Sequence, residues 1–234
     1  MVVAAGQLRS LVVSNDIFGA LGPEDVEILL SATSVRNYAA HQPVFHQGDA
    51  ADGVYVVCDG RVGIRTLSAD GNEVMLNIVE PGGVFGEIAA IDGGPRTAGA
   101  VTMEPSSLAY IDARTFHRLL ERSSPLCMRL LMLVCERLRW TSEIIEESHF
   151  HDVRARLIHR LIRLQGTYGE GSGSNTEIRL KVTQEMLARM LGVTRESVNK
   201  ELMHLQRRGL ITYNRGLITI LDSEGLLEAA EPAQ

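Results

Sequence analysis

The spacing of hydrophobic positions changes along the chain, and each spacing predicts a different kind of element. Residues 15–37 are expected to form a short helical entry, in which Asn15 and Asp16 can cap one helix and Pro23 opens the next. From about residue 41 to residue 111, short runs rich in Val and Ile alternate with Gly-containing turn sequences. This texture predicts a small antiparallel barrel or jelly roll.

The turns of this region carry a hairpin signal. Asp-Gly pairs separate the β-rich runs, and Gly accepts the positive φ that a tight turn requires. The expected strands are residues 54–57, 62–64 and 73–79, and the expected turns are residues 52–53, 59–60 and 70–71.

Residues 124–148 follow a helical period, which predicts one long helix. Apolar or small side chains recur at alternating spacings of four and three residues, as in an a/d seam: Cys127, Leu131, Val134, Leu138, Thr141, Ile145 and Ser148. Such a stripe packs either on its own domain or against the same helix of a second copy. Hydroxyl side chains on the seam indicate a polar role for its second half.

After residue 150 the pattern changes again. Asp152 is a good N-cap for a helix over residues 153–164, and the Gly- and Ser-rich residues 166–174 are expected to form a flexible surface loop. Two helices then follow, at residues 183–190 and 195–209, with Gly192 at the turn between them. A hairpin over residues 210–221, with its turn at 214–216, completes the order of a winged helix-turn-helix.

The second of these helices carries side chains suited to reading DNA. Arg195 can donate two bonds to guanine, Glu196 can accept from cytosine, and Lys200 reaches a guanine or a phosphate one turn later. Hydroxyl and amide groups beside them suit phosphate oxygens. The predicted DNA-binding set is Thr183, Gln184, Thr194, Arg195, Glu196, Ser197 and Lys200. The structural alternative is a solvated helix with a Glu196–Lys200 pair.

Charge is unevenly distributed. Residues 149–216 contain twelve Lys and Arg against six Asp and Glu, a balance of +6, and the whole chain of 234 residues carries −6, which leaves −12 for the rest. A basic block on an acidic chain indicates an anionic partner for one domain. The alternative is that these residues decorate helix surfaces.

Composition narrows the class of protein. A hydrophobic content of 45% is typical of a globular chain, and there is no run of about 18 uncharged apolar residues to span a membrane. Three scattered cysteines do not make a disulfide framework. Because Arg9 interrupts the apolar start and no cleavage pattern follows, we expect no secretory signal and a cytoplasmic location.

A Gly-rich segment at residues 81–98 is the second functional signal. Its glycines do not fit a dinucleotide-binding fingerprint, and it lies in a β-rich region. Gly86 lets the backbone approach an anion, the turn after it presents N–H groups, and Arg96 can bring a guanidinium to a phosphate. Glu87 is placed to accept a hydrogen bond from a sugar hydroxyl. The alternative is an ordinary β-turn with a surface Glu–Arg pair.

These motifs resemble a known family. Residues 85–89 and 96–98, the long-helix stretch 136–143 and the reading helix 194–198 are similar to the cyclic-AMP receptor branch of the bacterial Crp/Fnr transcription regulators. The resemblance covers roughly residues 15–222. It implies an α+β fold made of an N-terminal antiparallel β-roll that binds a cyclic nucleotide (residues 1–123), a dimerisation helix (124–149) and a C-terminal winged helix-turn-helix (150–234).

The resemblance also implies roles for individual residues. Glu87 would hold the ribose 2′-hydroxyl, and Arg96 with the backbone of Gly86, Glu87, Ile88 and Ala89 would hold the cyclic phosphate. Arg137 would support the phosphate and Glu87 from the long helix. Thr141 of one subunit and Ser142 of its partner would bond the base, which explains hydroxyls on an apolar seam.

Three positions depart from the family pattern. Arg61 stands where a small hydroxyl residue near the base is expected, and Thr97 replaces a serine beside Arg96. Because Arg-Thr-Ala also resembles the cyclic-GMP-preferring cassettes of eukaryotic kinases, cyclic GMP is a second candidate ligand beside cyclic AMP. Lys200 replaces an arginine and is a point charge rather than a fork, so we expect a TGTGA-like half-site with relaxed preference there.

Other classes are weighed against this interpretation. An iron–sulfur sensor needs about four cysteine ligands, a haem sensor would need an axial ligand such as His41 or His46, and a constitutive DNA-binding repressor would carry a vestigial pocket. No nucleophile–base or metal-ligand spacing suggests an enzyme. A module regulating a kinase or channel does not fit a chain whose other domain reads DNA.

The expected mechanism follows from the polar seam. A homodimer binds the nucleotide, which satisfies Thr141 and Ser142, lengthens the coiled coil to a hinge at Phe150 and sets two reading helices about 34 Å apart on palindromic DNA. The expected partners are a second copy, a double-stranded operator, the nucleotide and RNA polymerase.

Overall fold

The computed structural model describes residues 5–67, 73–170, 176–178 and 180–230. The chain forms two compact units, made mainly of residues 1–138 and 139–234, and the boundary between them lies inside one long helix. Within the described residues, no helix is both long enough and apolar enough to cross a bilayer.

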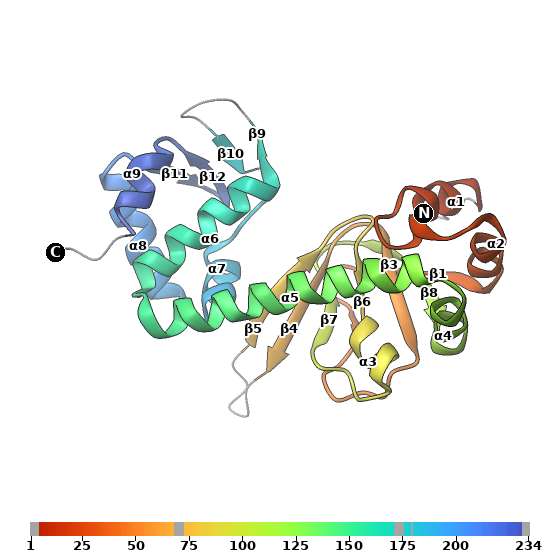
Figure 1. The fold of residues 1–234 in the computed structure, drawn as a ribbon. Coiled ribbons are helices and arrows are strands. Elements are labelled where there is room, and N and C mark those ends of the chain that lie inside the picture. Colours follow the sequence, from red (N-terminus) through yellow and green to blue (C-terminus); the bar gives the residue numbers. More distant parts are fainter. Residues whose placement is uncertain (1–4, 68–72, 171–175, 179, 231–234) are drawn as a thin grey trace. The chain divides into compact units, whose positions relative to one another are not determined.

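The N-terminal unit is a β-roll of two four-stranded sheets (Figure 1). One sheet has the order β1-β8-β3-β6 and the other β2-β7-β4-β5. The strands are β1 (Thr33–Tyr38), β2 (Pro43–Phe45), β3 (Gly53–Asp59), β4 (Val62–Leu67), β5 (Glu73–Val79), β6 (Val84–Phe85), β7 (Gly99–Thr102) and β8 (Ser106–Asp112). The pairings of β8 with β1 and β3, and of β7 with β2 and β4, are antiparallel.

Two hydrophobic cores stabilise this unit. One is built on strand residues of both sheets, among them Tyr55, Phe85 and Leu108. The other joins the roll to the helices gathered at one end of it in Figure 1, and Phe18 and Phe116 are fully buried there. These helices are α1 (Ala5–Ser14), the 3-10 turn η1 (Phe18–Ala20), α2 (Pro23–Ala32), α4 (Ala113–Arg122) and the start of α5 (Ser124–Phe150). A short helix, α3 (Glu87–Asp92), follows β6.

Two local predictions for this unit are wrong. Residues 33–37 form strand β1 and not helix, because the β-branched Thr33 and Val35 favour an extended backbone that pairs with β8. The Asp59-Gly60 turn does not close a hairpin, since β3 and β4 belong to different sheets. The turn at 70–71 lies outside the described residues. The strand over residues 73–79 is confirmed.

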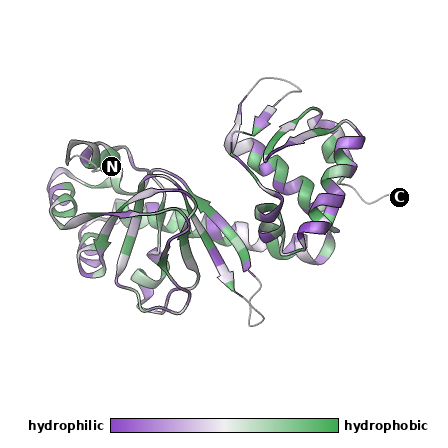
Figure 2. Cartoon of the chain, turned by 180° about the vertical axis from the view of Figure 1, so that it is seen from behind, coloured by the Kyte–Doolittle hydropathy of each residue, from purple (hydrophilic) through white to green (hydrophobic). Residues whose placement is uncertain are grey.

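The C-terminal unit is a winged helix-turn-helix. Its sheet has the order β11-β12-β10-β9, and Figure 2 shows hydrophobic and hydrophilic residues along each of its longer helices. The elements are α6 (Val153–Tyr168), β9 (Gly169–Glu170), β10 (Thr176–Ile178), α7 (Gln184–Leu191), α8 (Arg195–Arg207), β11 (Ile211–Asn214), β12 (Leu217–Ile220) and α9 (Ser223–Glu228). Leu187, Val198 and Leu202 are buried where α7 packs on α8.

The expected fold class is therefore confirmed, with one difference in this unit. Helix α6 continues four residues past its expected end at 164, and β9 follows it directly, so the first part of the loop expected at 166–174 is wrong. Gly166 costs the helix about 1 kcal/mol relative to Ala, which does not end a helix of 16 residues. Residues 171–175 lie outside the described part.

The Asp152 cap is confirmed and can be tested. Its side chain accepts a hydrogen bond from the backbone N of Ala155 at 2.9 Å. We expect Asp152→Ala to lower the free energy of unfolding of the C-terminal unit by about 1 kcal/mol, and Asp152→Asn, which still caps, to change it little. Fluorescence of Trp140, the single tryptophan, reports on this unit during denaturant unfolding. Equal stability of the Ala and Asn variants would contradict the capping role.

Candidate functional sites

A left-handed glycine turn positions the first site in the β-roll. Strand β6 ends at Phe85, and Gly86 with φ of 79° turns the chain into α3. A Cβ at residue 86 would lie 2.5 Å from Nη1 of Arg96, so the turn also needs glycine for space. The backbone therefore brings Glu87 and Arg96 to the same place.

Arg96 is buried and strongly held. Its side chain is 1% exposed, Nη1 donates to the carbonyl of Gly86 at 2.7 Å, and Nη2 donates to Asp52 Oδ1 at 2.7 Å and to the carbonyl of Gly53 at 2.8 Å. The guanidinium lies 4.2 Å from the ring centroid of Phe45. Among the described residues, its Nε has no hydrogen-bond partner although it is buried.

Glu87 is also buried, and α5 provides its cation. The Glu87 side chain is fully buried, and Oε1 accepts a hydrogen bond from Nη1 of Arg137. Nη2 of Arg137 donates to the carbonyl of Val84 at 2.6 Å, which ties the long helix to the end of β6. The second carboxylate oxygen, Oε2, has no partner among the described residues.

The unpartnered atoms define what this site can bind. Leaving a buried polar atom without a partner costs about 1–3 kcal/mol, and more for a charged group. Arg96 Nε needs an acceptor, best supplied by an anion, and Glu87 Oε2 needs a donor such as a hydroxyl. A ligand that carries both groups would satisfy both atoms.

The other residues expected in this site are not all beside Arg96. Ala89 is buried, whereas Ile88 and Thr97 are exposed. Arg61 follows the far end of β3, roughly 20 Å of strand from Gly53. There Glu80 and Glu104 each hold it at 3.1 Å, so the structure does not bring Arg61 to Arg96.

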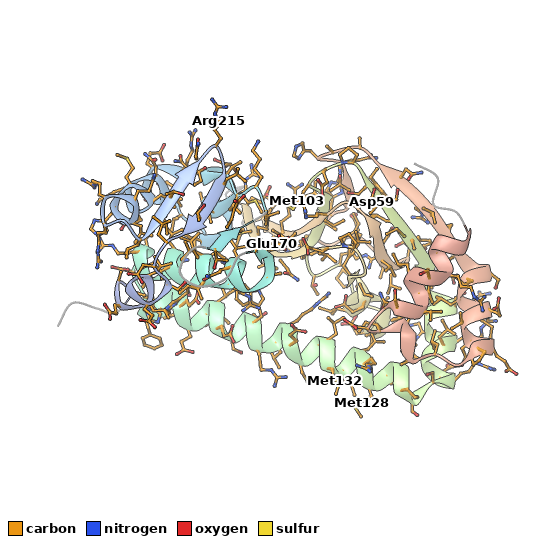
Figure 3. The ribbon with its side chains drawn as sticks, turned by 90° about the horizontal axis from the view of Figure 1, so that it is seen from above. Asp59, Met103, Met128, Met132, Glu170 and Arg215 are labelled. Carbon is orange, nitrogen blue, oxygen red and sulfur yellow. The ribbon has the colours of Figure 1, made fainter. Side chains whose placement is uncertain are left out.

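Thr141 and Ser142 follow Arg137 by about one turn on α5, and both are exposed. The a/d seam predicted for residues 124–148 coincides only in part with the exposed face of α5. Leu131, Leu138 and Ile145 are exposed, but Cys127 and Val134 are half-buried, and the Cys127 thiol contacts the carbonyl of Leu120. Figure 3 shows Met128 and Met132 projecting from α5, and both are more than half exposed.

The second site is the face of the helix-turn-helix. Thr183 and Thr194 cap α7 and α8, and their hydroxyls accept from the backbone N of Met186 and Ser197 at 3.1 and 3.2 Å. Each hydroxyl keeps its own hydrogen as a donor. Gly192, with φ of 63°, makes the turn between the helices.

The predicted DNA-binding side chains lie together at the start of α8. Arg195, Glu196 and Lys200 are exposed, and Ser197 is half-buried with its hydroxyl 3.0 Å from that of Thr194. Gln184 links the two helices, since it donates to Asn199 at 2.8 Å and accepts from Arg195 Nε at 3.3 Å. This network fixes the direction of Arg195.

The basic block has two parts in the structure. Several of its arginines bind groups of their own unit: Arg154 pairs with Glu201 at 2.8 Å, Arg156 donates to the carbonyl of Leu191, and Arg163 pairs with Glu143 at 3.0 Å. The alternative that basic residues only decorate helix surfaces therefore accounts for part of the positive charge of residues 149–216. Arg195, Lys200, Arg207, Arg208 and Arg215 are exposed.

Sequence reasoning missed two contributors to these sites. Asp52 holds the Arg96 guanidinium, although its Asp-Gly sequence signalled only a turn. Arg215 has φ of 50° and is followed by Gly216 at 90°, which matches a two-residue hairpin turn with both central residues at positive φ. Figure 3 shows Arg215 projecting from the tip of the hairpin, away from its unit. The position of Arg215 in the predicted turn could have signalled this.

Family models match both units. The cyclic nucleotide-binding domain matches residues 35–123, and the Crp-like helix-turn-helix domain matches residues 155–229. The chain is 29% identical over 214 residues to a CRP-like cAMP-activated global transcriptional regulator of Mycobacterium tuberculosis, covering 92% of this chain and 96% of that protein. It has the same identity and coverage with the cyclic AMP receptor protein of Thermus thermophilus.

A solved structure shares the fold. The c-di-GMP responsive global regulator CLP of Xanthomonas campestris is 26% identical, with a TM-score of 0.72 over 85% of this chain and 99% of that one. The cyclic nucleotide-binding model matches the N-terminal unit, and the helix-turn-helix model matches the C-terminal unit. The chain, with its cyclic nucleotide-binding domain and Crp-like helix-turn-helix, belongs to the Crp/Fnr family of transcription regulators.

Proposed function

We propose that this protein is a homodimeric transcription regulator switched by a cyclic nucleotide, with cyclic AMP as the first candidate ligand and cyclic GMP as the second. The observation that carries the proposal is the pair of buried, unpartnered atoms Arg96 Nε and Glu87 Oε2 beside the Gly86 turn. A cyclic nucleotide carries a phosphate for the first and a ribose hydroxyl for the second. Relatives named for cyclic AMP support this ligand class.

Thr97 is the residue that favours cyclic GMP as the second candidate ligand. It follows Arg96 directly and its side chain is exposed, so its hydroxyl is available to a base. Arg61 is left out of the proposed pocket because Glu80 and Glu104 hold it at the other end of β3. A third candidate ligand is a cyclic dinucleotide, which the name of the Xanthomonas campestris relative favours.

The exposed apolar stripe of α5 supports a second copy as partner. Five apolar side chains of this helix are each more than half exposed: Met128, Leu131, Met132, Leu138 and Ile145. Contiguous exposed apolar surface of this kind is typical of protein–protein interfaces. Helix α5 is continuous to Phe150, so the proposed ligand acts by fixing how two such helices pair along a coiled coil that reaches this hinge. Thr141 of one subunit and Ser142 of the partner subunit would then contact the base.

The proposed DNA mode places α8 in the major groove. Arg195 and Lys200 face bases, Glu196 accepts from a cytosine, and Thr183, Gln184, Thr194 and Ser197 contact phosphates. Arg215, at the tip of the hairpin, adds a phosphate contact beside the helix. A palindromic, TGTGA-like operator and RNA polymerase complete the proposed set of partners.

The first test is calorimetric titration of the nucleotide-free protein with cyclic AMP, cyclic GMP and cyclic di-GMP. We expect cyclic AMP to bind and Arg96→Gln to weaken it by at least about tenfold, since a charged hydrogen bond is lost. Arg118→Gln, an exposed arginine of α4, is the control and should bind normally. Failure of all three ligands to bind a folded protein would contradict the proposal.

The bridging role of the hydroxyls is tested separately. We expect the double variant Thr141→Ala, Ser142→Ala to lose ligand-dependent binding to palindromic DNA in a gel shift, because the ligand must favour one state by about 5.5 kcal/mol to switch it fully. Ser31→Ala removes an exposed hydroxyl of α2, outside the seam, and should leave the switch intact. Unchanged switching in the double variant would contradict bridging.

Arg195 is the sharpest test of the DNA mode. We expect Arg195→Glu to reduce operator affinity by roughly a hundredfold or more, because a bidentate guanine contact becomes a repulsive charge, while nucleotide affinity stays the same. The exposed Arg118→Glu makes the same charge change in the other unit. Loss of both activities in Arg195→Glu would indicate misfolding, and a wild-type gel shift would overturn the assignment.

A further inference from the structure

A cavity of about 240 Å³ lies in the C-terminal unit, and none of its lining residues belongs to α7 or α8. The second half of α5 forms one wall, α6 a second, and Leu227 of α9 lines it as well. Trp140, Ile162 and Leu227 give the cavity apolar surface. Its size is below the 300–1,000 Å³ typical of pockets for drug-sized ligands, so it suits a smaller molecule.

Arg160 supplies a buried cation to this cavity. The residue is 7% exposed, and burial lowers the pKa of its guanidinium to about 10. Its Nη2 donates to the carbonyl of Met190 at 3.3 Å, and its charge lies 4.5 Å from the ring centroid of Trp140. Nε is buried and has no partner among the described residues. An acceptor in the cavity would remove this deficit.

Most of the remaining charge around the cavity is already paired. Arg163 lies 3.3 Å from the Trp140 ring centroid and bonds Glu143 at 3.0 Å, so these two neutralise each other. Glu147 lies 3.5 Å from Nδ1 of His159, a contact between charges only when the histidine is protonated. The cavity therefore offers a buried guanidinium whose Nε has no acceptor among the described residues, and a partly buried carboxylate, Glu147, that can accept a hydrogen bond.

We propose that this cavity binds a small aliphatic α-amino acid. The carboxylate accepts from Arg160 Nε, the ammonium group donates to Glu147, and the aliphatic side chain packs against Trp140, Ile162 and Leu227. A zwitterion fits better than a simple anion because the wall charges of Arg160 and Glu147 are opposite, and an anion alone would face the Glu147 carboxylate. The site is independent of the nucleotide bound by the β-roll.

A ligand in this cavity would touch α5 and α6 at once. Arg160 and Ile162 belong to α6, whereas Trp140 and Glu147 belong to α5. A bound amino acid would therefore tighten the packing of the end of α5 on the first helix of the DNA-binding domain. The chain would then carry a second small-molecule input.

The experiment uses Trp140, the single tryptophan of the chain, as its reporter. The full-length protein is titrated with L-leucine, with leucinamide, which lacks the carboxylate, and with isocaproate, which has the same skeleton without the amino group. We expect a saturable change in fluorescence with L-leucine. Each analogue should bind at least about tenfold more weakly, since each loses one charged hydrogen bond.

Two matched variants test whether L-leucine binds in this cavity. Glu147→Gln should weaken L-leucine by at least about tenfold, and Glu146→Gln, its exposed neighbour on α5, should not. Calorimetry with the same three compounds checks the optical signal. The proposal is overturned if L-leucine gives no saturable change in protein that still binds its operator. The proposal is also overturned if either analogue binds as tightly as L-leucine, or if Glu147→Gln and Glu146→Gln bind L-leucine equally well.

Discussion

A fully buried carboxylate is costly unless a cation and hydrogen-bond donors face it, and Glu87 is such a group. Arg137 neutralises it from α5 and holds the carbonyl of Val84 with the same guanidinium. The long helix is thus attached to the β-roll at the carboxylate that also has an unpartnered oxygen. A ligand that bonds Glu87 would act on the residue that anchors α5, with no intermediate contacts needed between pocket and helix.

The local pattern of the sequence predicted most elements but could not predict all of their partners. The 3.6-residue period gave α5 and the two helices around Gly192, and β-branched runs gave β3 to β5, because these signals act within one element. Asp59-Gly60 looks like a hairpin turn, yet its strands go to different sheets. Residues 33–37 are extended because β8, some seventy residues later, pairs with them. The β-branched Thr33 and Val35 favour an extended backbone locally, but the sequence around them does not show which strand they pair with.

The candidate sites divide in the same way. Gly86, Glu87 and Arg96 stand close in sequence, so their grouping was predictable, as was the row of side chains that opens α8. Asp52 contacts Arg96 only because of the path of the chain into β3. Arg61 does not lie beside Arg96, because it pairs with Glu80 and Glu104 after the other end of β3. The heptad stripe of α5 is exposed at Leu131, Leu138 and Ile145, whereas Cys127 and Val134 are half-buried and Met128 is exposed.

The sheet order has a consequence for the synthesis of the chain. Strand β1 pairs with β8, and β3 pairs with β8 as well, so the first sheet cannot close until residue 112 has left the ribosome. At about 5–20 residues per second, the edge of β1 that pairs with β8 stays unpaired for roughly 4–15 seconds after β1 emerges. During this interval the Val- and Ile-rich strands are exposed to other nascent chains. The N-terminal helices, which are local structures, are the elements able to form first and cover part of this surface.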